Sequence, residues 1–164
     1  MNVRLAYARD LSGFLALAAQ VEHWFGPMVD DPGFRAAVAA HIGDAKALVA
    51  VEEPAPAEDG AAEPPLLGGL LFGSDAPLFH VHWLVVSERA RGRGVGAALM
   101  GDAMKRYVTG PGTVEVITFG ADHPGAVVSG ARVFYERLGF TPAETAGPGP
   151  EGGSRQVYRL TVPS

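Results

Sequence analysis

Two histidines placed two residues apart, His80 and His82, are the side chains of this sequence best suited to moving protons. Histidine titrates near neutral pH, so a neutral imidazole can take a proton from an ammonium group, directly or through water. The apolar run from Phe79 to Val86 predicts a strand, on which both histidines point to one face. Two half-buried strand histidines with ordinary partners are the alternative interpretation. We expect the histidine face to carry Leu84 and Val86, and the opposite face to carry Phe79, Val81, Trp83 and Val85.

A metal site at this histidine pair is a weaker hypothesis. Zinc sites need three or four protein ligands, and no other Cys or His clusters with the pair in the sequence. We therefore expect no bound metal. The chain has no cysteine at all, which excludes disulfides and a cysteine nucleophile and fits a reducing compartment such as the cytoplasm.

A glycine-rich turn follows the predicted strand. Its sequence is Arg91-Gly92-Arg93-Gly94-Val95-Gly96, and a helical pattern from Ala97 to Tyr107 comes next. Glycines let the backbone turn tightly, and the first N–H groups of a helix have no partner within it, so this order predicts a backbone site for an anion such as a pyrophosphate. A dinucleotide fold would carry such a turn after its first strand, and a Walker loop would continue with Gly-Lys-Ser/Thr. A helix start that is merely rich in glycine remains the simplest alternative.

A third polar group, Asp122-His123, lies just past the predicted strand Thr113 to Phe119. It is a candidate base, but the Pro124-Gly125 that follows favours ordinary turn chemistry.

The size and charge of the chain limit its function class. A length of 164 residues with 48% hydrophobic residues predicts one globular domain, residues 1–164. The net charge of −5 argues against a general affinity for nucleic acid. No apolar run approaches the roughly 20 residues that a membrane helix needs. The N-terminus lacks signal-peptide features, so we expect a cytoplasmic protein with no membrane or nucleic-acid partner.

Hydrophobic periodicity predicts an α/β protein. We expect one strand, two helices, three strands, a helix, a strand, a helix and two strands. The strands fall at 3–8, 47–52, 66–72, 79–86, 113–119, from 140 onward and 156–161, and the helices at about 12–21, 32–42, 97–107 and through 131–138. The runs 66–72 and 79–86 are predicted to form an antiparallel hairpin, which makes the sheet mixed rather than all-parallel. Residues 53–65, rich in Pro, Ala and acid, are expected to form a flexible surface loop.

Two segments together resemble the acyl-CoA signature of the GNAT acetyltransferases. One is Arg91-x-x-Gly94-x-Gly96 after Leu84-Val85-Val86, and the other is the segment ARVFYERLGF from Ala131 to Phe140. The predicted element order agrees with that family from about residue 3 to residue 162. The resemblance implies an acetyl-CoA-dependent N-acetyltransferase with a mixed, mostly antiparallel central sheet, splayed at the acyl-CoA site and flanked by helices.

The resemblance also implies a binding site for the donor. In this family the backbone N–H groups of the glycine turn hold the CoA pyrophosphate, and the preceding strand binds the pantetheine arm. These roles fall here on Leu84, Val85, Val86, Arg91, Gly92, Arg93, Gly94, Val95 and Gly96. The family often has an Asn early in its last helix that touches the pantetheine; the matching region is Val127-Val128-Ser129, where Ser129 is the substitute or the contact is missing.

The resemblance implies further roles in catalysis. Tyr135 matches the family tyrosine that protonates the leaving sulfur, although a purely structural place on its apolar helix face is the alternative. One branch, the arylalkylamine acetyltransferases, has a His-x-His pair at the same offset before the turn, and His82 lies nearer the splay than His80. Glu22, Trp24 and Phe25 lie where the family builds its acceptor pocket, although the two aromatics are equally suited to packing a helix junction.

The sequence thus predicts direct transfer of an acetyl group from acetyl-CoA to a primary amine, with a histidine or water base, Tyr135 as the acid and backbone N–H near Val86 polarising the thioester. A non-catalytic acyl-CoA sensor on the same fold and a nucleotide-binding regulatory domain are the alternatives. We expect a small cationic amine as acceptor, while peptides and protein lysines stay open. The resemblance also allows a homodimer.

Overall fold

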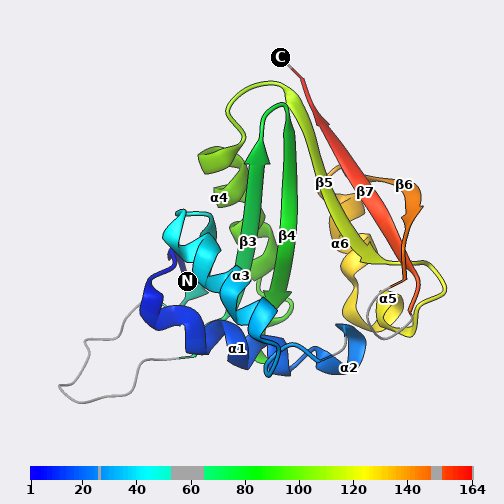
Figure 1. The fold of residues 1–164 in the computed structure, drawn as a ribbon. Helices are drawn as coiled ribbons and strands as arrows, with labels where there is room; N and C mark the ends of the chain where they lie inside the picture. The colour runs from blue at the N-terminus through cyan, green and yellow to red at the C-terminus, as the bar shows by residue number, and fades with distance from the viewer. Residues whose placement is uncertain (26, 53–64, 149–152, 164) are drawn as a thin grey trace.

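The computed structural model describes residues 1–25, 27–52, 65–148 and 153–163 of the chain (Figure 1). In this part of the chain, seven strands form one sheet in the order β1-β2-β3-β4-β5-β7-β6, with helices on both faces. The strands are β1 (Asn2–Leu5), β2 (Ala47–Val51), β3 (Gly68–Asp75), β4 (Leu78–Val86), β5 (Gly112–Phe119), β6 (Thr141–Ala146) and β7 (Arg155–Val162). The predicted mixed α/β architecture is confirmed. The predicted loop 53–65 lies outside the described residues except for Pro65, which is exposed.

The helices follow the predicted order, with short additions. The α-helices are α1 (Leu11–Ala19), α2 (Glu22–Phe25), α3 (Pro32–Gly43), α4 (Val95–Tyr107), α5 (Pro124–Ser129) and α6 (Ala131–Arg137), and the 3-10 helices are η1 (Ala8–Asp10) and η2 (Glu88–Ala90). The last helical region is divided because Gly130 adopts a left-handed conformation, with φ of 67°, between α5 and α6. Among the described helices, none is both long and apolar enough to cross a membrane.

A local sequence signal accounts for where α3 begins. Asp31 caps α3 by accepting a hydrogen bond from the N–H of Gly33 at 2.9 Å, and Pro32 takes the first helical position. Asp10, in contrast, does not cap α1 with its side chain. Its buried carboxylate accepts hydrogen bonds from the guanidinium of Arg4 at 2.8 Å and from the N–H of Tyr7 at 2.7 Å, and so ties β1 to the start of α1.

The pairing of β4 with β5 sets this sheet apart from a simple antiparallel one. It is parallel, whereas all the other recorded strand pairs are antiparallel. The pairing begins at Leu78 and Thr113 and runs only to Val81 and Val116. Beyond that point β4 continues to pair with β3, and β5 with β7, so the two central strands diverge toward the lower end of the sheet (Figure 1).

A β-bulge lies in β4 where the strands begin to diverge. Leu71 of β3 is opposite Trp83, but the next residue, Phe72, is opposite Val81. His82 is therefore the extra residue, with no counterpart across the ladder. Bulges of this kind bend a strand and increase its local twist, so the bulge gives a physical reason for the departure of β4 from β5.

Each face of the sheet packs against its own helices. Leu48, Ala50, Leu70 and Phe72 belong to the same buried cluster as Leu99 and Ala103 of α4 and Tyr135 of α6. Ala47, Val49 and Leu71 belong to a second cluster with Phe14 and Leu17 of α1 and Val38 of α3. Strands β2 and β3 thus have residues buried on both faces, which explains their nearly continuous apolar sequences.

Leu99, which has no exposed surface, anchors α4 and with it the glycine turn on the sheet. We expect Leu99→Ala to lower the free energy of unfolding by about 2–5 kcal/mol, because it removes buried methyl groups and leaves a cavity. Leu78→Ala is the matched control, since Leu78 is 36% exposed at the start of β4. Urea denaturation of both variants tests this, and equal losses at the two leucines would contradict the assigned packing.

Candidate active site

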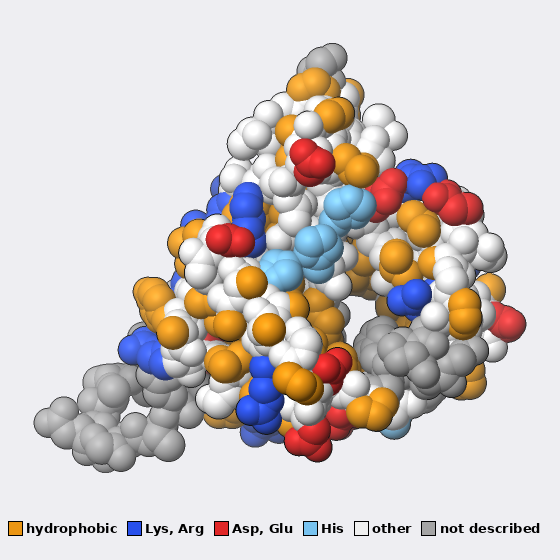
Figure 2. Space-filling model, in the orientation of Figure 1, with side chains coloured by type: hydrophobic (Ala, Val, Ile, Leu, Met, Phe, Trp, Pro, Cys, Tyr) orange, Lys and Arg blue, Asp and Glu red, His pale blue; other side chains and the backbone are white. Residues whose placement is uncertain are grey.

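Two cavities lie along the gap between β4 and β5. One, of about 480 Å³, is lined by the glycine turn and by residues of α5 and α6. The other, of about 340 Å³, is lined by the histidine segment of β4 and by β5. Both cavities are lined by Leu84, Val85, Phe119, Ala131 and Tyr135. The cavities therefore meet within the gap, and Figure 2 shows the surface opened at this place between the two halves of the sheet.

The glycine turn forms one wall of the larger cavity. Gly92 and Gly94 both have φ of 79°, a region that other residues rarely adopt. The first hydrogen bond of α4 runs from the N–H of Ala98 to the carbonyl oxygen of Gly94. The N–H groups of Val95, Gly96 and Ala97 come before that bond, at the positive end of the helix dipole, so their position suits an anion.

Close packing brings α6 against this turn. A Cβ on Gly96 would come within 3.0 Å of the Phe134 ring, so glycine allows α4 and α6 to approach at this point. Arg91 lines the cavity, as do Gly92, Gly94, Val95, Gly96 and the backbone-binding candidates Leu84, Val85 and Val86. Arg93 does not line it; its guanidinium contacts the Glu52 carboxylate at 2.6 Å, with both side chains exposed.

Three residues of the last helices complete the larger cavity. Ser129 lies at its edge, and its hydroxyl oxygen accepts a hydrogen bond from the N–H of Ala131 at 3.2 Å. Phe134 and Arg137 also line it, although the sequence pattern did not single them out. Arg137 lies in the last turn of a helix. This position alone does not show whether its side chain faces a cavity or the outer surface.

Tyr135 lies between the two cavities. Its side chain is 5% exposed and packs against the rings of Phe134, Phe140 and Tyr158. Burial raises the pKa of the Tyr135 phenol well above its usual value. The hydroxyl therefore stays protonated at neutral pH and can donate a hydrogen bond.

The histidine face differs from the predicted one. His80 and His82 do share a face, but the bulge at His82 interrupts the alternation that follows. Trp83 and Val85 pack with the cluster under α1 and α3, the side on which His82 contacts His41 of α3. Leu84 and Val86 pack with the opposite cluster. The predicted grouping of the histidines with Leu84 and Val86 is thus wrong, because one extra residue reverses every later side chain in a strand.

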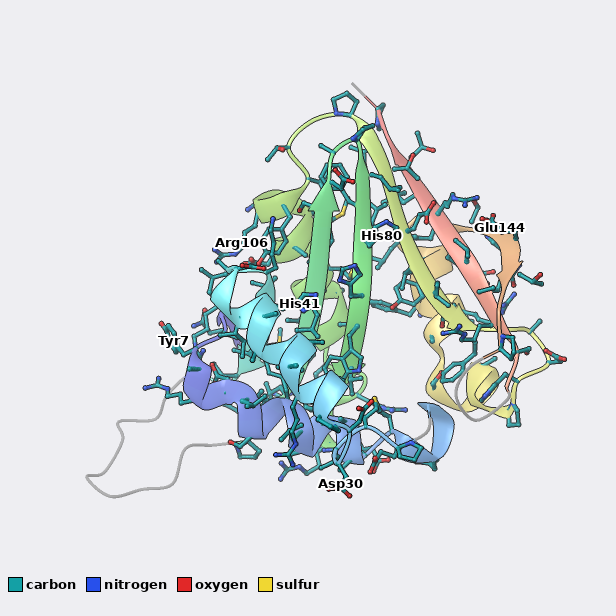
Figure 3. All side chains as sticks on the ribbon, in the orientation of Figure 1. Tyr7, Asp30, His41, His80, Arg106 and Glu144 are labelled. Atoms are coloured by element: carbon teal, nitrogen blue, oxygen red, sulfur yellow. The ribbon has the colours of Figure 1, made fainter. Side chains whose placement is uncertain are left out.

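The histidines belong to a longer row of polar side chains that reaches across the sheet. The His41 and His82 rings meet edge to face at 5.1 Å, and the His80 and His82 rings stack at 5.8 Å. Nδ1 of His80 lies 3.9 Å from Oε2 of Glu115, whose other oxygen accepts a hydrogen bond from Arg159 at 2.7 Å. Figure 2 shows this row of histidines along the gap, and Figure 3 shows His41 and His80 coming to it from α3 and β4.

The environment of His82 favours its neutral form. Partial burial of the ring lowers the pKa of His82, and the neighbouring His41 and His80 lower it further. Neutral imidazole is the form that accepts a proton. Within the described residues, no group of three or more His, Asp or Glu side chains has the arrangement of a metal site.

Glu22, Asp122 and His123 have hydrogen-bond partners outside this row. The carboxylate of Glu22 accepts a hydrogen bond from the N–H of Met28 at 2.6 Å and so holds the loop after α2. The backbones of Trp24 and Phe25 lie in α2, but their side chains lie outside the described structure. Asp122 accepts a hydrogen bond from Ser154, and the Nδ1 of buried His123 accepts one from the N–H of Gly125 at 2.8 Å, which fits a role in the turn.

Comparison with known proteins places these features in a common fold. A family described as acetyltransferase (GNAT) domain matches residues 44–142. Ard1 from Thermoplasma volcanium has a similar structure, with a TM-score of 0.72 and 16% identity over 99% of this chain and 98% of that one. No protein with a curated description matches the sequence.

Two further solved structures show the same fold. An aminoglycoside 6'-N-acetyltransferase complexed with coenzyme A has a TM-score of 0.71 and 16% identity, over 100% of this chain and 99% of that one. A ribosomal-protein-alanine N-acetyltransferase from Brucella melitensis has a TM-score of 0.67 and 18% identity, over 99% of this chain and all of that one.

The glycine turn offers a test of its backbone conformation. We expect Gly94→Ala to destabilise the protein by about 1 kcal/mol, because alanine is strained at positive φ. The same substitution at Gly101, inside α4 with open space around it, should stabilise the protein by about 0.5–1 kcal/mol. Thermal and urea unfolding of the two variants measure both changes, and a stabilising Gly94→Ala would rule out the left-handed turn.

Proposed function

The chain belongs to the GNAT family of acetyltransferases, and we propose that it transfers an acetyl group from acetyl-CoA to a primary amine by direct attack. The observation that carries this proposal is the meeting of two cavities at Tyr135. One cavity has the features of an anion site, and the other has neutral histidine at its wall. A donor and an acceptor entering from opposite sides would meet beside a phenol able to give up a proton.

The larger cavity fits the donor. Its open N–H groups at Val95, Gly96 and Ala97 suit a pyrophosphate, and Arg91 and Arg137 add positive charge at its edge. The edge of β4 after Val81 faces the gap with no register partner on β5, so its backbone groups are available to an extended pantetheine arm. The coenzyme A in the aminoglycoside acetyltransferase of the same fold supports this choice of donor.

Acetyl-CoA supplies a thioester carbonyl and a thiolate leaving group. Backbone N–H groups on the free edge of β4, near Val86, stabilise the negative charge that develops on the carbonyl oxygen. The bond from the amine nitrogen to the acetyl carbon forms as the carbon–sulfur bond breaks. Tyr135 gives its proton to the sulfur, and the buried ring contacts around it hold its hydroxyl in place.

His82 removes the proton from the attacking amine, directly or through water. Its lowered pKa keeps the imidazole neutral at physiological pH. His80 is the second candidate for this role, because it lines the same cavity and stacks on His82. The chain has no cysteine, which leaves direct attack, rather than an acyl-cysteine route, as the proposed path.

The smaller cavity favours a small amine as acceptor. A volume of about 340 Å³ suits a small molecule or the end of a peptide chain rather than a bulky surface. Glu115 contributes a carboxylate to its wall, and Ile117, Val157 and Trp83 contribute apolar surface. A cationic amine with an apolar body matches this combination. Ammonium deprotonation near the histidines then yields the nucleophile.

The role of Tyr135 can be tested by removing only its hydroxyl. We expect Tyr135→Phe to lower kcat at least about 100-fold, because the sulfur loses its proton donor. Calorimetry should show that this variant binds acetyl-CoA with an affinity within about twofold of that of the unmodified protein. The reason is that the hydroxyl is proposed to act on the leaving sulfur and not in binding the donor. Tyr7→Phe is the matched control, because Tyr7 is 51% exposed and lines neither cavity.

Release of free thiol in a screen of amine acceptors gives the rate for these variants. Absence of acetyl-CoA binding at millimolar concentration would overturn the proposal. Binding without turnover on any amine would instead favour a non-catalytic acyl-CoA sensor.

The pH dependence of the rate tests the base. A base must be neutral, so activity should be lost as pH falls through the pKa of His82, which lies below the ordinary histidine value of about 6.5. His82→Ala should remove this acidic limb from the kcat/KM profile and lower the rate at neutral pH. If the limb persists in His82→Ala but disappears in His80→Ala, His80 is the base.

A further inference from the structure

A third histidine, His41 on α3, contacts the candidate base from outside the catalytic strands. Its Nδ1 lies 2.6 Å from the carbonyl oxygen of Ala37, one helical turn earlier. A carbonyl oxygen only accepts hydrogen bonds, so Nδ1 of His41 carries a hydrogen. In the neutral ring, Nε2 of His41 is then an acceptor.

This assignment determines the tautomer of the next ring. Nε2 of His41 lies 2.8 Å from Nδ1 of His82, so Nδ1 of His82 donates the hydrogen bond. Neutral His82 therefore has its hydrogen on Nδ1 and its lone pair on Nε2. The Ala37 carbonyl thus determines the tautomer of His41, and His41 determines the tautomer of His82.

The backbone of β3 also limits the position of the His82 ring. A Cβ on Gly73 would come within 2.4 Å of Cε1 and 2.7 Å of Nε2 of His82, so only glycine leaves room for the ring in this place. His82 is nevertheless exposed on its open side, along the smaller cavity. The ring is held between α3 and β3 while it remains accessible from that cavity.

We propose that His41 is a positioning residue for the acetyl transfer: it holds His82 in the orientation and the Nδ1–H tautomer that leave Nε2 free to take the proton of the amine. This inference rests on the proposed function, in which His82 is the base. The amine N–H bond breaks and a bond from hydrogen to Nε2 of His82 forms, while the Nδ1–H bond of His82 stays intact. The hydrogen bond from Nδ1 of His82 to Nε2 of His41 holds the ring in place throughout this step.

The surroundings of the pair are consistent with this role. His41 lies in the last turn of α3, where the helix dipole favours positive charge. The other titratable groups nearby are His80 on β4, Glu115 on β5, which is 3.9 Å from His80, and Lys46, which donates a hydrogen bond to Ser74 of β3.

Two substitutions at His41 separate positioning from packing. His41→Leu removes the acceptor but keeps a side chain of similar size, and we expect kcat to fall about tenfold or more with KM for acetyl-CoA unchanged within about twofold. Its acidic limb should move up toward that of an ordinary histidine. His41→Gln offers an amide oxygen to Nδ1 of His82, and we expect it to restore kcat to within about threefold of the unmodified protein.

Val38→Ala is the structural control, because Val38 is fully buried on the same helix without belonging to the histidine row. We expect it to lower Tm but to leave the acidic limb in place. A merely structural role of His41 predicts that His41→Leu behaves as Val38→Ala does, and that result would overturn the inference.

Nitrogen-15 NMR of the imidazoles gives a readout that does not depend on activity. We expect the hydrogen of neutral His82 on Nδ1 in the unmodified protein and a loss of this preference in His41→Leu. Gly73→Ala, which must displace the His82 ring, should have the same effect without any change at His41. A hydrogen on Nε2 of His82 in the unmodified protein would refute the positioning role.

Substitutions at His82 and at His41 distinguish the base assignment from the positioning role. If His82→Ala retains full activity, the base assignment in the proposed function is wrong. If His82→Ala loses activity while His41→Leu keeps both the rate and the acidic limb, the base assignment stands and the positioning role of His41 is wrong.

Discussion

The short parallel pairing of β4 with β5 is the constraint on which the rest of the structure depends. The two strands are hydrogen-bonded only from Leu78 and Thr113 to Val81 and Val116, and each then follows its other neighbour. Unpaired backbone groups in a sheet interior cost free energy unless they face water or a ligand. The gap therefore leaves these groups open to water or to a ligand, and the two cavities that share Tyr135 occupy it. Both the proposed donor site and the proposed acceptor site exist because the ladder stops there.

The two faces of the sheet divide the proposed reaction between them. The glycine turn, α4 and α6 belong to one face, where backbone N–H groups and arginines suit an anion. The histidine row belongs to the other face, against α3, where a proton can be taken from an amine. The bulge at His82 makes this division possible, because it turns the histidines and Trp83 to the same side while Leu84 and Val86 stay on the donor side. Without the extra residue, Trp83 would point to the opposite face from His82.

Burial and hydrogen bonding set the protonation states that the proposed chemistry needs. The phenol of Tyr135 is kept protonated because its charged form would have to be buried among aromatic rings. His82 is kept neutral because its ring is partly desolvated and two other imidazoles lie beside it. A protonated phenol, Tyr135, and a neutral imidazole, His82, therefore line one continuous space. The net charge of −5 has little part in this, because the local groups, and not the sum over the surface, determine both states.

The sequence by itself determined the elements and the general place of the site. Hydrophobic periodicity predicted the order of strands and helices, and the turn from Arg91 to Gly96 pointed to an anion site, because these features depend on neighbours a few residues apart. The pairing of His80 with His82 was also visible, but their face was predicted wrongly, since a bulge depends on the partner strand. Arg137, Glu115 and above all His41 could not be found from the sequence: His41 is 41 positions from His82, and only the packing of α3 on the sheet brings their ring nitrogens to 2.8 Å. Spacing along the chain determined which residues could do chemistry, and contacts between distant segments decided which of them meet.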